Sequence, residues 1–179
     1  MIPAHDDEPR RNVELKALDP WPEATLERCL ALGVEDRGEI WQQDTYFYVP
    51  SGRLKLREQL PGAPHLIHYD RADQPRQRES RYRIAAVNDA DGMRHVLAQS
   101  LGIRGMVVKR RHLLLCENVR IHLDTVESLG RFIELEAVAA TRSDLTYEHG
   151  LIAELRSALD ITRDRLVAHG YADQLLTAG

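Results

Sequence analysis

The chain has 179 residues, 43% of them hydrophobic, which is enough for one domain with one core. A net charge of −4 argues against nucleic-acid binding, no apolar run approaches the ~20 residues of a membrane span, and residues 1–12 lack the apolar stretch of a secretory signal. Two cysteines without metal-type spacing exclude a disulfide framework, so we expect a soluble, cytoplasmic protein with a single domain over residues 1–179.

Alternation of apolar and polar residues dominates the first half and predicts mainly β-strands. Strands are expected at 12–18, 39–49, 53–58 and 66–71. Asp19-Pro20 opens a predicted helix to about Leu32, with Leu26, Cys29 and Leu30 as its buried stripe. Residues 72–80 lack apolar periodicity and predict a mobile loop.

The second half continues with a strand at 81–87 and a helix capped by Asp89 and ended by Gly102. Strands at 105–116, 118–124 and 131–139 follow too closely for crossover helices and are therefore antiparallel neighbours. Leu151, Ile152, Leu155 and Leu159 mark a C-terminal helix, and a short helical tail ends at Leu176. The whole pattern predicts an α+β fold, an antiparallel β-barrel of about eight strands with peripheral helices, because closure removes exposed sheet edges.

Charged residues recur two positions apart on five predicted strands, which places each set on one face of its strand. The sets are Glu14 and Lys16; Lys55 and Arg57; Lys109 and Arg111; Arg120, His122 and Asp124; and Glu134 and Glu136. One such set is ordinarily a solvated face, but five in one small domain favour a charged interior. Only three of the 24 basic residues are lysines, and each lies in one of these sets.

An interior with this density of charge has to be wide, wet and built for a ligand, because buried charge is costly without compensation. Lysine and arginine donate to phosphate oxygens, so six cations suit a ligand with several phosphates. The carboxylates suit one or two hard cations, Mg²⁺ or Mn²⁺, that bridge to the phosphates. The sequence therefore predicts a metal-dependent site for a triphosphate.

Seven segments occur in an order that is typical of one protein family. They are Asn12-Val13-Glu14-Leu15-Lys16, Gln42 to Phe47, Gly52 to Arg57, Val108 to Arg111, Val119 to Asp124, Gly130 to Phe132, and Glu134-Leu135-Glu136. With them the chain resembles, from about residue 11 to 176, the CYTH family of triphosphate tunnel metalloenzymes. That family includes class IV adenylate cyclases and thiamine triphosphatases.

The resemblance implies an eight-stranded antiparallel tunnel that binds a small-molecule triphosphate with Mg²⁺ or Mn²⁺, and it allows a homodimer. It implies Glu14, Glu134 and Glu136 as metal ligands, with Asp124 a ligand or near-ligand. The implied phosphate contacts are Lys16, Lys55, Arg57, Lys109, Arg111 and Arg120, with Arg71 in place of a lysine that many members have where this chain has Tyr69. Of all these, Lys16, Arg57 and Asp124 are the expected catalytic residues.

Two departures from the family pattern bear on the reaction. Asn12 stands where the ExExK motif has its first glutamate; it offers a carbonyl oxygen without a charge, which weakens a two-metal site more than a one-metal site. The His-Phe pair that precedes this motif in class IV cyclases is absent. Both favour a triphosphate phosphohydrolase. The alternatives are a class IV adenylate cyclase, making cyclic AMP and pyrophosphate from ATP, and a non-catalytic nucleotide or polyphosphate binding module.

Some residues keep two interpretations. His122 is either a proton acceptor or ligand, or a hydrogen-bonded interior histidine. Tyr46 and Tyr48 either pack or line a leaving-group pocket. The arginines between positions 71 and 83 form either a lid over the phosphates or a solvated basic loop; they are Arg71, Arg76, Arg78, Arg81 and Arg83.

Overall fold

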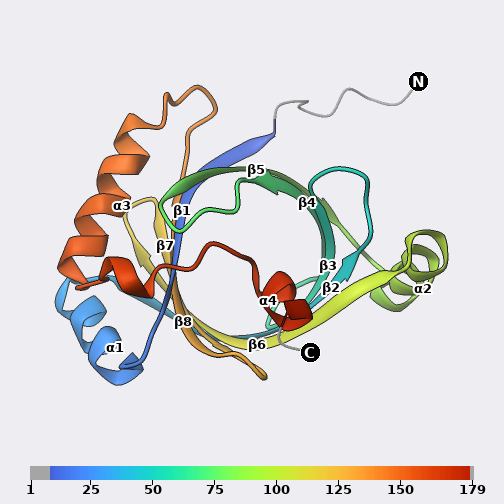
Figure 1. Ribbon diagram of the computed structural model, residues 1–179, viewed down its shortest axis with the longest axis horizontal. Helices are drawn as coiled ribbons and strands as arrows, with labels where there is room; N and C mark the ends of the chain where they lie inside the picture. Colours follow the sequence, from blue (N-terminus) through green and yellow to red (C-terminus); the bar gives the residue numbers. More distant parts are fainter. Residues whose placement is uncertain (1–8, 178–179) are drawn as a thin grey trace.

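The computed structural model describes residues 9–177, over which the chain forms eight β-strands and four α-helices (Figure 1). The strands are β1 (Arg10–Leu18), β2 (Glu35–Phe47), β3 (Arg53–Leu60), β4 (His65–Arg71), β5 (Arg78–Ala86), β6 (Ile103–Cys116), β7 (Val119–Val126) and β8 (Gly130–Val138). The helices are α1 (Pro22–Ala31), α2 (Ala90–Leu101), α3 (Thr146–Ala158) and α4 (Tyr171–Thr177). The expectation about a secretory signal falls largely on residues 1–8, which lie outside the described residues.

The sheet closes on itself in the order β1-β5-β4-β3-β2-β6-β7-β8, with every neighbouring pair antiparallel. β1 completes the closure because it pairs with β5 on one side and with β8 on the other. The β1–β8 register sets Glu14 opposite Glu136 and Lys16 opposite Glu134. The predicted closed antiparallel barrel is confirmed, and one face of each strand points into it.

The main apolar core lies outside the barrel wall, between β1, β8 and the helices α1 and α3. Val13 and Leu15 of β1 and Leu135 of β8 are buried there with Cys29 of α1 and Ile152 of α3. Because successive side chains of a strand point to opposite faces, these outward apolar residues alternate with inward polar ones. The burial of the outer face therefore supplies hydrophobic stabilisation while the interior stays polar.

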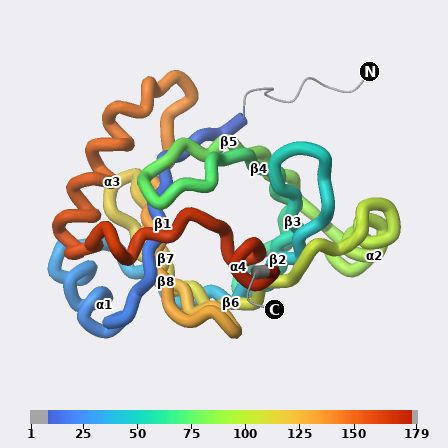
Figure 2. The backbone as a smooth tube through the Cα atoms, viewed as in Figure 1, coloured from blue at the N-terminus to red at the C-terminus, as the bar shows by residue number. Residues whose placement is uncertain are grey.

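The remaining two helices take different positions around the barrel. α2 covers the outer face of β2 and β3, where Phe47 and Leu56 are buried against Met93 and Leu97. Figure 2 shows the C-terminal segment crossing one end of the ring of strands to reach α4. None of the described helices is long and apolar enough to cross a membrane.

The helix signals of the sequence hold for α2 and only in part for α1. As predicted, the Asp89 carboxylate caps α2, and Gly102 ends it with a φ of 77°. α1 begins at Pro22, later than predicted, and Asp19 accepts a hydrogen bond from Thr25 Oγ1 at 2.7 Å instead of starting the helix. Leu30 was wrongly assigned to the buried stripe; it is 48% exposed.

The predicted mobile loop at 72–80 is wrong in its last three residues. Arg78, Glu79 and Ser80 lie in β5 and pair with β1. These residues are polar on both faces of the strand, so no apolar alternation marks them in the sequence. The correction matters for the site, because Arg78 is fully buried inside the barrel.

A core position on the outer wall gives a direct check of this arrangement. Replacing Leu135 by alanine should lower the free energy of unfolding by about 2–5 kcal/mol, because a fully buried leucine leaves a cavity. Urea denaturation measures the change. The matched control is Val96→Ala on α2, where the side chain is 60% exposed and the change should stay within about 0.5 kcal/mol. Equal effects at the two positions would contradict a core outside the barrel.

Candidate functional site: a charged cavity inside the barrel

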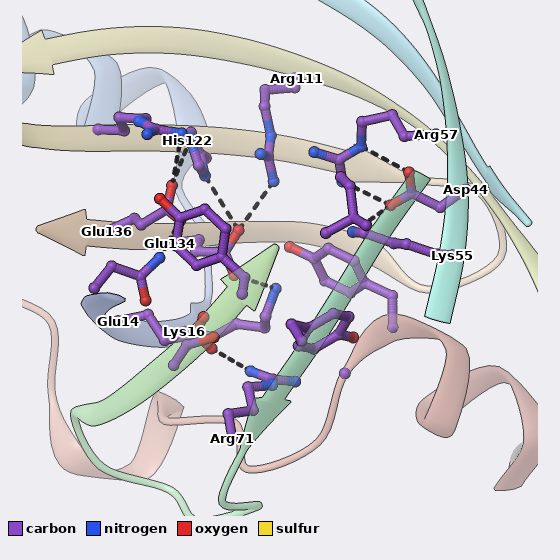
Figure 3. Close-up of a pocket in the computed structure, with 18 of the residues that line it drawn as sticks. Glu14, Lys16, Asp44, Lys55, Arg57, Arg71, Arg111, His122, Glu134 and Glu136 are labelled. Carbon is purple, nitrogen blue, oxygen red and sulfur yellow. Dashed lines mark hydrogen bonds and ion pairs between the residues drawn. The ribbon is translucent and has the colours of Figure 1, made fainter. Parts of the chain in front are cut away.

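The inward faces of the strands enclose a cavity of about 150 Å³ (Figure 3). Seven cationic side chains line it against four carboxylates. The cations are Lys16, Lys55, Arg57, Arg71, Lys109, Arg111 and Arg120, and the carboxylates are Glu14, Asp44, Glu134 and Glu136. The structure therefore brings together all the cations that the sequence placed in a shared interior, with Arg71 among them.

Asp44 of β2 holds Lys55 and Arg57 of β3. Its carboxylate accepts two hydrogen bonds from Arg57, both at 2.7 Å, and one from Lys55 Nζ at 2.9 Å. Burial works to raise the pKa of Asp44, but the Arg57 and Lys55 charges outweigh it and hold this pKa well below its usual range. Sequence reasoning missed Asp44 as a site residue, although it stands directly opposite Arg57 in the β2–β3 register.

Asp124 of β7 repeats this arrangement with the cations of β6. It accepts two hydrogen bonds from Arg111 at 2.7 Å and one from Lys109 Nζ at 2.9 Å, and it too stands opposite the arginine in register. A further bond comes from the Tyr171 hydroxyl at 2.9 Å. Burial favours a raised pKa, yet the Arg111 and Lys109 charges keep the pKa of Asp124 well below normal. Two neighbouring hairpins thus carry equivalent aspartate–lysine–arginine units.

Glu134 of β8 connects three side chains from different strands. Lys16 Nζ and an Arg111 nitrogen each lie 2.9 Å from its carboxylate, and His122 Nδ1 lies at 3.1 Å. Burial and the nearby Arg111 charge lower the pKa of His122 to about 4, so its ring is neutral near pH 7. This geometry favours a hydrogen-bonded interior histidine.

Glu14 of β1 is paired with two arginines, Arg71 at the end of β4 and Arg78 at the start of β5. Arg71 donates to its carboxylate, and Arg78 lies 3.2 Å away. The sequence placed Arg78 in a loop, as part of a lid or of a solvated basic segment; the structure instead places it in β5, two residues before Ser80, which lines the cavity. Of the arginines in this region, Arg71 and Arg78 face inward, whereas the Arg81 side chain is 62% exposed.

The last part of the cavity wall is formed by Asn12, Glu136 and Arg120. The Asn12 amide nitrogen donates to Glu136, and Arg120 lies 3.4 Å from the same carboxylate. The Asn12 carbonyl oxygen is buried without a hydrogen-bond partner. Together with the carboxylates of Glu14 and Glu134, the Glu136 and Asn12 side chains provide oxygen atoms, which are the ligands that Mg²⁺ and Mn²⁺ prefer. The chemical type of these residues therefore suits a hard divalent cation.

The carboxylates do not converge as metal ligands while they face cations. Within residues 9–177, no group of three histidine, cysteine, aspartate or glutamate side chains could hold a metal ion as they stand. The side chains predicted as metal ligands are instead paired with cations: Glu14 with Arg71 and Arg78, and Glu134 with Lys16 and Arg111.

Tyr46, Tyr69, Tyr82 and Tyr171 form part of the cavity wall, and neither Tyr82 nor Tyr171 was anticipated from the sequence. Tyr171 of α4 is buried in the cavity, with Lys16 Nζ 3.5 Å from the centre of its ring. No local sequence signal could have found it, since its position depends on how the C-terminal segment packs. Tyr46 also lines the cavity, whereas Tyr48, predicted on the same face, is 57% exposed.

The lysines of the cavity are weaker bases than usual. Burial, reinforced by Arg111, lowers the pKa of Lys109 to about 7. Burial and the Arg57 charge lower the pKa of Lys55 to about 8. Both lysines therefore lose part of their charge near neutral pH, and an anion bound beside them would favour the charged form.

The inner wall of this closed barrel carries seven lysine and arginine side chains beside four carboxylates. The model of the CYTH domain matches residues 10–170, and the chain belongs to the CYTH family. It has no significant match among curated protein sequences.

Solved structures show the same fold. The PH1012 protein from Pyrococcus horikoshii OT3 gives a TM-score of 0.79 at 22% identity, over 90% of this chain and 98% of that one. A proposed adenylate cyclase from Vibrio parahaemolyticus gives 0.79 at 18% identity, over 94% and 99% of the two chains. HpAC1 from Hippeastrum, a proposed adenylyl cyclase described as having a dominant triphosphatase activity, gives 0.62 at 11% identity over 94% and 95%.

The lowered lysine pKa values give an expected pH dependence of anion binding. Lys109 and Lys55 are cationic below about pH 7 and 8 respectively, and a bound anion stabilises that form, so binding takes up protons. Affinity for sulfate, whose own charge is constant here, should fall as the pH rises from 6 to 9, by up to about tenfold per lysine for each pH unit above its pKa. Calorimetry measures it. Lys109→Arg should flatten the slope above pH 7, because arginine stays charged; an affinity that rises with pH would contradict the assignment.

Proposed function

We propose that the protein is a divalent-metal-dependent triphosphate phosphohydrolase that acts on an inorganic or organic triphosphate. The observation that carries the proposal is the gathering of seven cations around one narrow cavity, against four lining carboxylates and the buried Asp124 that holds Lys109 and Arg111. A triphosphate concentrates several negative charges along a short chain, which matches cations presented from several strands. Positioning that chain and neutralising its oxygens is most of what phosphoryl transfer requires.

Phosphate binding would exchange the partners of the interior charges. Lys16 and Arg71 now face Glu134 and Glu14, and a triphosphate offers these cations other oxygens to bind. The released carboxylates, with Glu136 beside them, are the ligands that we propose for Mg²⁺ or Mn²⁺. A divalent cation held there supplies further charge neutralisation at the phosphate oxygens.

Within this proposal the predicted catalytic residues have distinct parts. Asp124 accepts hydrogen bonds from Lys109, Arg111 and Tyr171, so we assign it to holding those side chains rather than to direct contact with the metal. Lys16 and Arg57 are the cations that we assign to charge neutralisation during the reaction. The other proposed phosphate contacts are Lys55, Arg71, Lys109, Arg111 and Arg120.

A class IV adenylate cyclase is the second candidate, favoured by the likeness to the proposed cyclase from Vibrio parahaemolyticus. In that reaction the ATP 3′-hydroxyl attacks the α-phosphorus and pyrophosphate leaves. Cyclisation requires a purine pocket and a group that activates the 3′-hydroxyl. Asn12 is uncharged, so it provides no negative charge to strengthen metal binding for that step. The description of HpAC1, a proposed cyclase with a dominant triphosphatase activity, supports putting hydrolysis first.

One assay separates hydrolase, cyclase and binding module. The purified protein is incubated with Mg²⁺ or Mn²⁺ and, separately, with tripolyphosphate, ATP and thiamine triphosphate, and the products are resolved. Hydrolysis yields orthophosphate, cyclisation yields cyclic AMP with pyrophosphate, and a binding module yields neither. Cyclic AMP as the main product from ATP would replace the hydrolase by the cyclase.

The proposed metal ligand Glu134 can be tested with a nearly isosteric change. Glu134→Gln should reduce turnover to background, because the amide keeps the shape but loses the charge that binds a divalent cation. The variant should still fold, at a lower melting temperature, because Lys16 and Arg111 lose the charge of their partner. Turnover and thermal denaturation are measured together. Glu127→Gln, at an exposed position after β7, is the matched control and should keep full activity. Full turnover by Glu134→Gln would count against this ligand.

Asn12 allows the reverse experiment. Asn12→Glu adds a carboxylate beside Glu136, so it should lower the metal concentration for half-maximal activity by about tenfold, since affinity for hard cations rises with ligand charge. Without metal the two like charges repel, and the melting temperature should fall. Asn12→Gln is the neutral control. If Asn12→Glu leaves the metal concentration for half-maximal activity unchanged, the cation does not bind beside Asn12 and Glu136.

A further inference from the structure

Tyr171 enters the barrel cavity from outside the sheet. It is the first residue of α4, and its side chain is buried among residues of β1, β6, β7 and β8. The ring meets Phe132 edge to face at 4.9 Å between centroids. No other aromatic ring described here lies so close to a cavity lysine.

Two kinds of contact join this tyrosine to the charged residues. Lys16 Nζ lies 3.5 Å from the ring centroid and Lys109 Nζ lies 4.9 Å from it, both within the range of a cation–π interaction. The Tyr171 hydroxyl donates to Asp124, which in turn holds Lys109 and Arg111. One side chain thus contacts members of both neighbouring charge groups, the one around Glu134 and the one around Asp124.

The helix that carries Tyr171 is tied to the barrel wall by ion pairs. Asp173 lies 3.2 Å from Arg53 at the start of β3 and 2.5 Å from Arg104 at the start of β6. Upstream, the Val167 amide donates to the Lys16 carbonyl at 2.9 Å. These ties hold α4 across its end of the barrel, so the position of the ring beneath Lys16 is determined by the fold.

We propose that Tyr171 is a positioning residue for the polyanion site: its ring holds the Lys16 ammonium toward the bound phosphates, and its hydroxyl fixes Asp124 and thereby Lys109 and Arg111. Lysine has a long, flexible stem, so a ring against its ammonium reduces the ordering that binding would otherwise demand. This inference rests on the proposed function, because it supposes that the cavity binds a triphosphate.

The ring and the hydroxyl can be separated by substitution. Tyr171→Phe keeps the ring and should bind tripolyphosphate, in EDTA, within about twofold of the wild type; with metal its kcat should fall about tenfold, since Asp124 loses a charged hydrogen bond. Tyr171→Met fills similar space without a ring and should weaken tripolyphosphate binding by about tenfold. Calorimetry gives the affinities, and melting temperatures show whether each variant is folded. If the methionine variant does not fold, Tyr171→Leu takes its place.

The outcomes distinguish positioning from simple packing. Tyr147, an exposed residue of α3, supplies the control Tyr147→Met, which should match the wild type in every measurement. If folded Tyr171→Phe and Tyr171→Met bind tripolyphosphate equally well, the ring only fills space and the inference is overturned. If the wild type itself binds no tripolyphosphate either in EDTA or with Mg²⁺ or Mn²⁺ present, the proposed function is overturned and this inference with it. Binding that separates phenylalanine from methionine supports the positioning role.

Discussion

The charges inside the barrel can be buried there only because most carboxylates are shared between two cations. Asp44 and Asp124 each hold a lysine and an arginine, and Glu14 and Glu134 each lie between two cations from different strands. Removing any one carboxylate would leave buried cations without a partner, which is costly. Burial lowers the pKa of Lys109 and Lys55, and their aspartate partners work to raise it, so the shared carboxylates keep these lysines closer to their charged form.

The same sharing couples the two ligands that the cavity is proposed to bind. A cation alone meets carboxylates that are already neutralised, and an anion alone releases carboxylates that then repel one another. Each ligand removes the obstacle to the other, so their binding free energies are coupled and the coupling is reciprocal.

The sequence predicted the cationic residues of the cavity correctly, but it did not predict the roles of Arg78, Tyr171 and Asp44. Strand parity is local, so pairs such as Lys109 and Arg111 could be assigned to one face without knowing the fold. Arg78 was placed in a loop because a strand that is polar on both faces leaves no periodic signal. Tyr171 was missed because its place depends on packing between the chain end and the barrel, which no local pattern encodes. Asp44 lay in a recognised motif, but its role appears only when register pairs it with Arg57.

The residues that form the apolar core lie on the outer face of the barrel, and the residues proposed to bind ligand lie on its inner face. Val13 and Leu135 face α1 and α3, while their neighbours Asn12, Glu14 and Glu134 face the cavity. A change at an inward position therefore alters ligand chemistry without removing buried apolar area. Asn12 is such an inward position, so exchanging it for glutamate changes the oxygen ligands of the cavity and leaves the apolar outer core in place. The fold can acquire a new substrate one inward residue at a time, with the structural scaffold left in place.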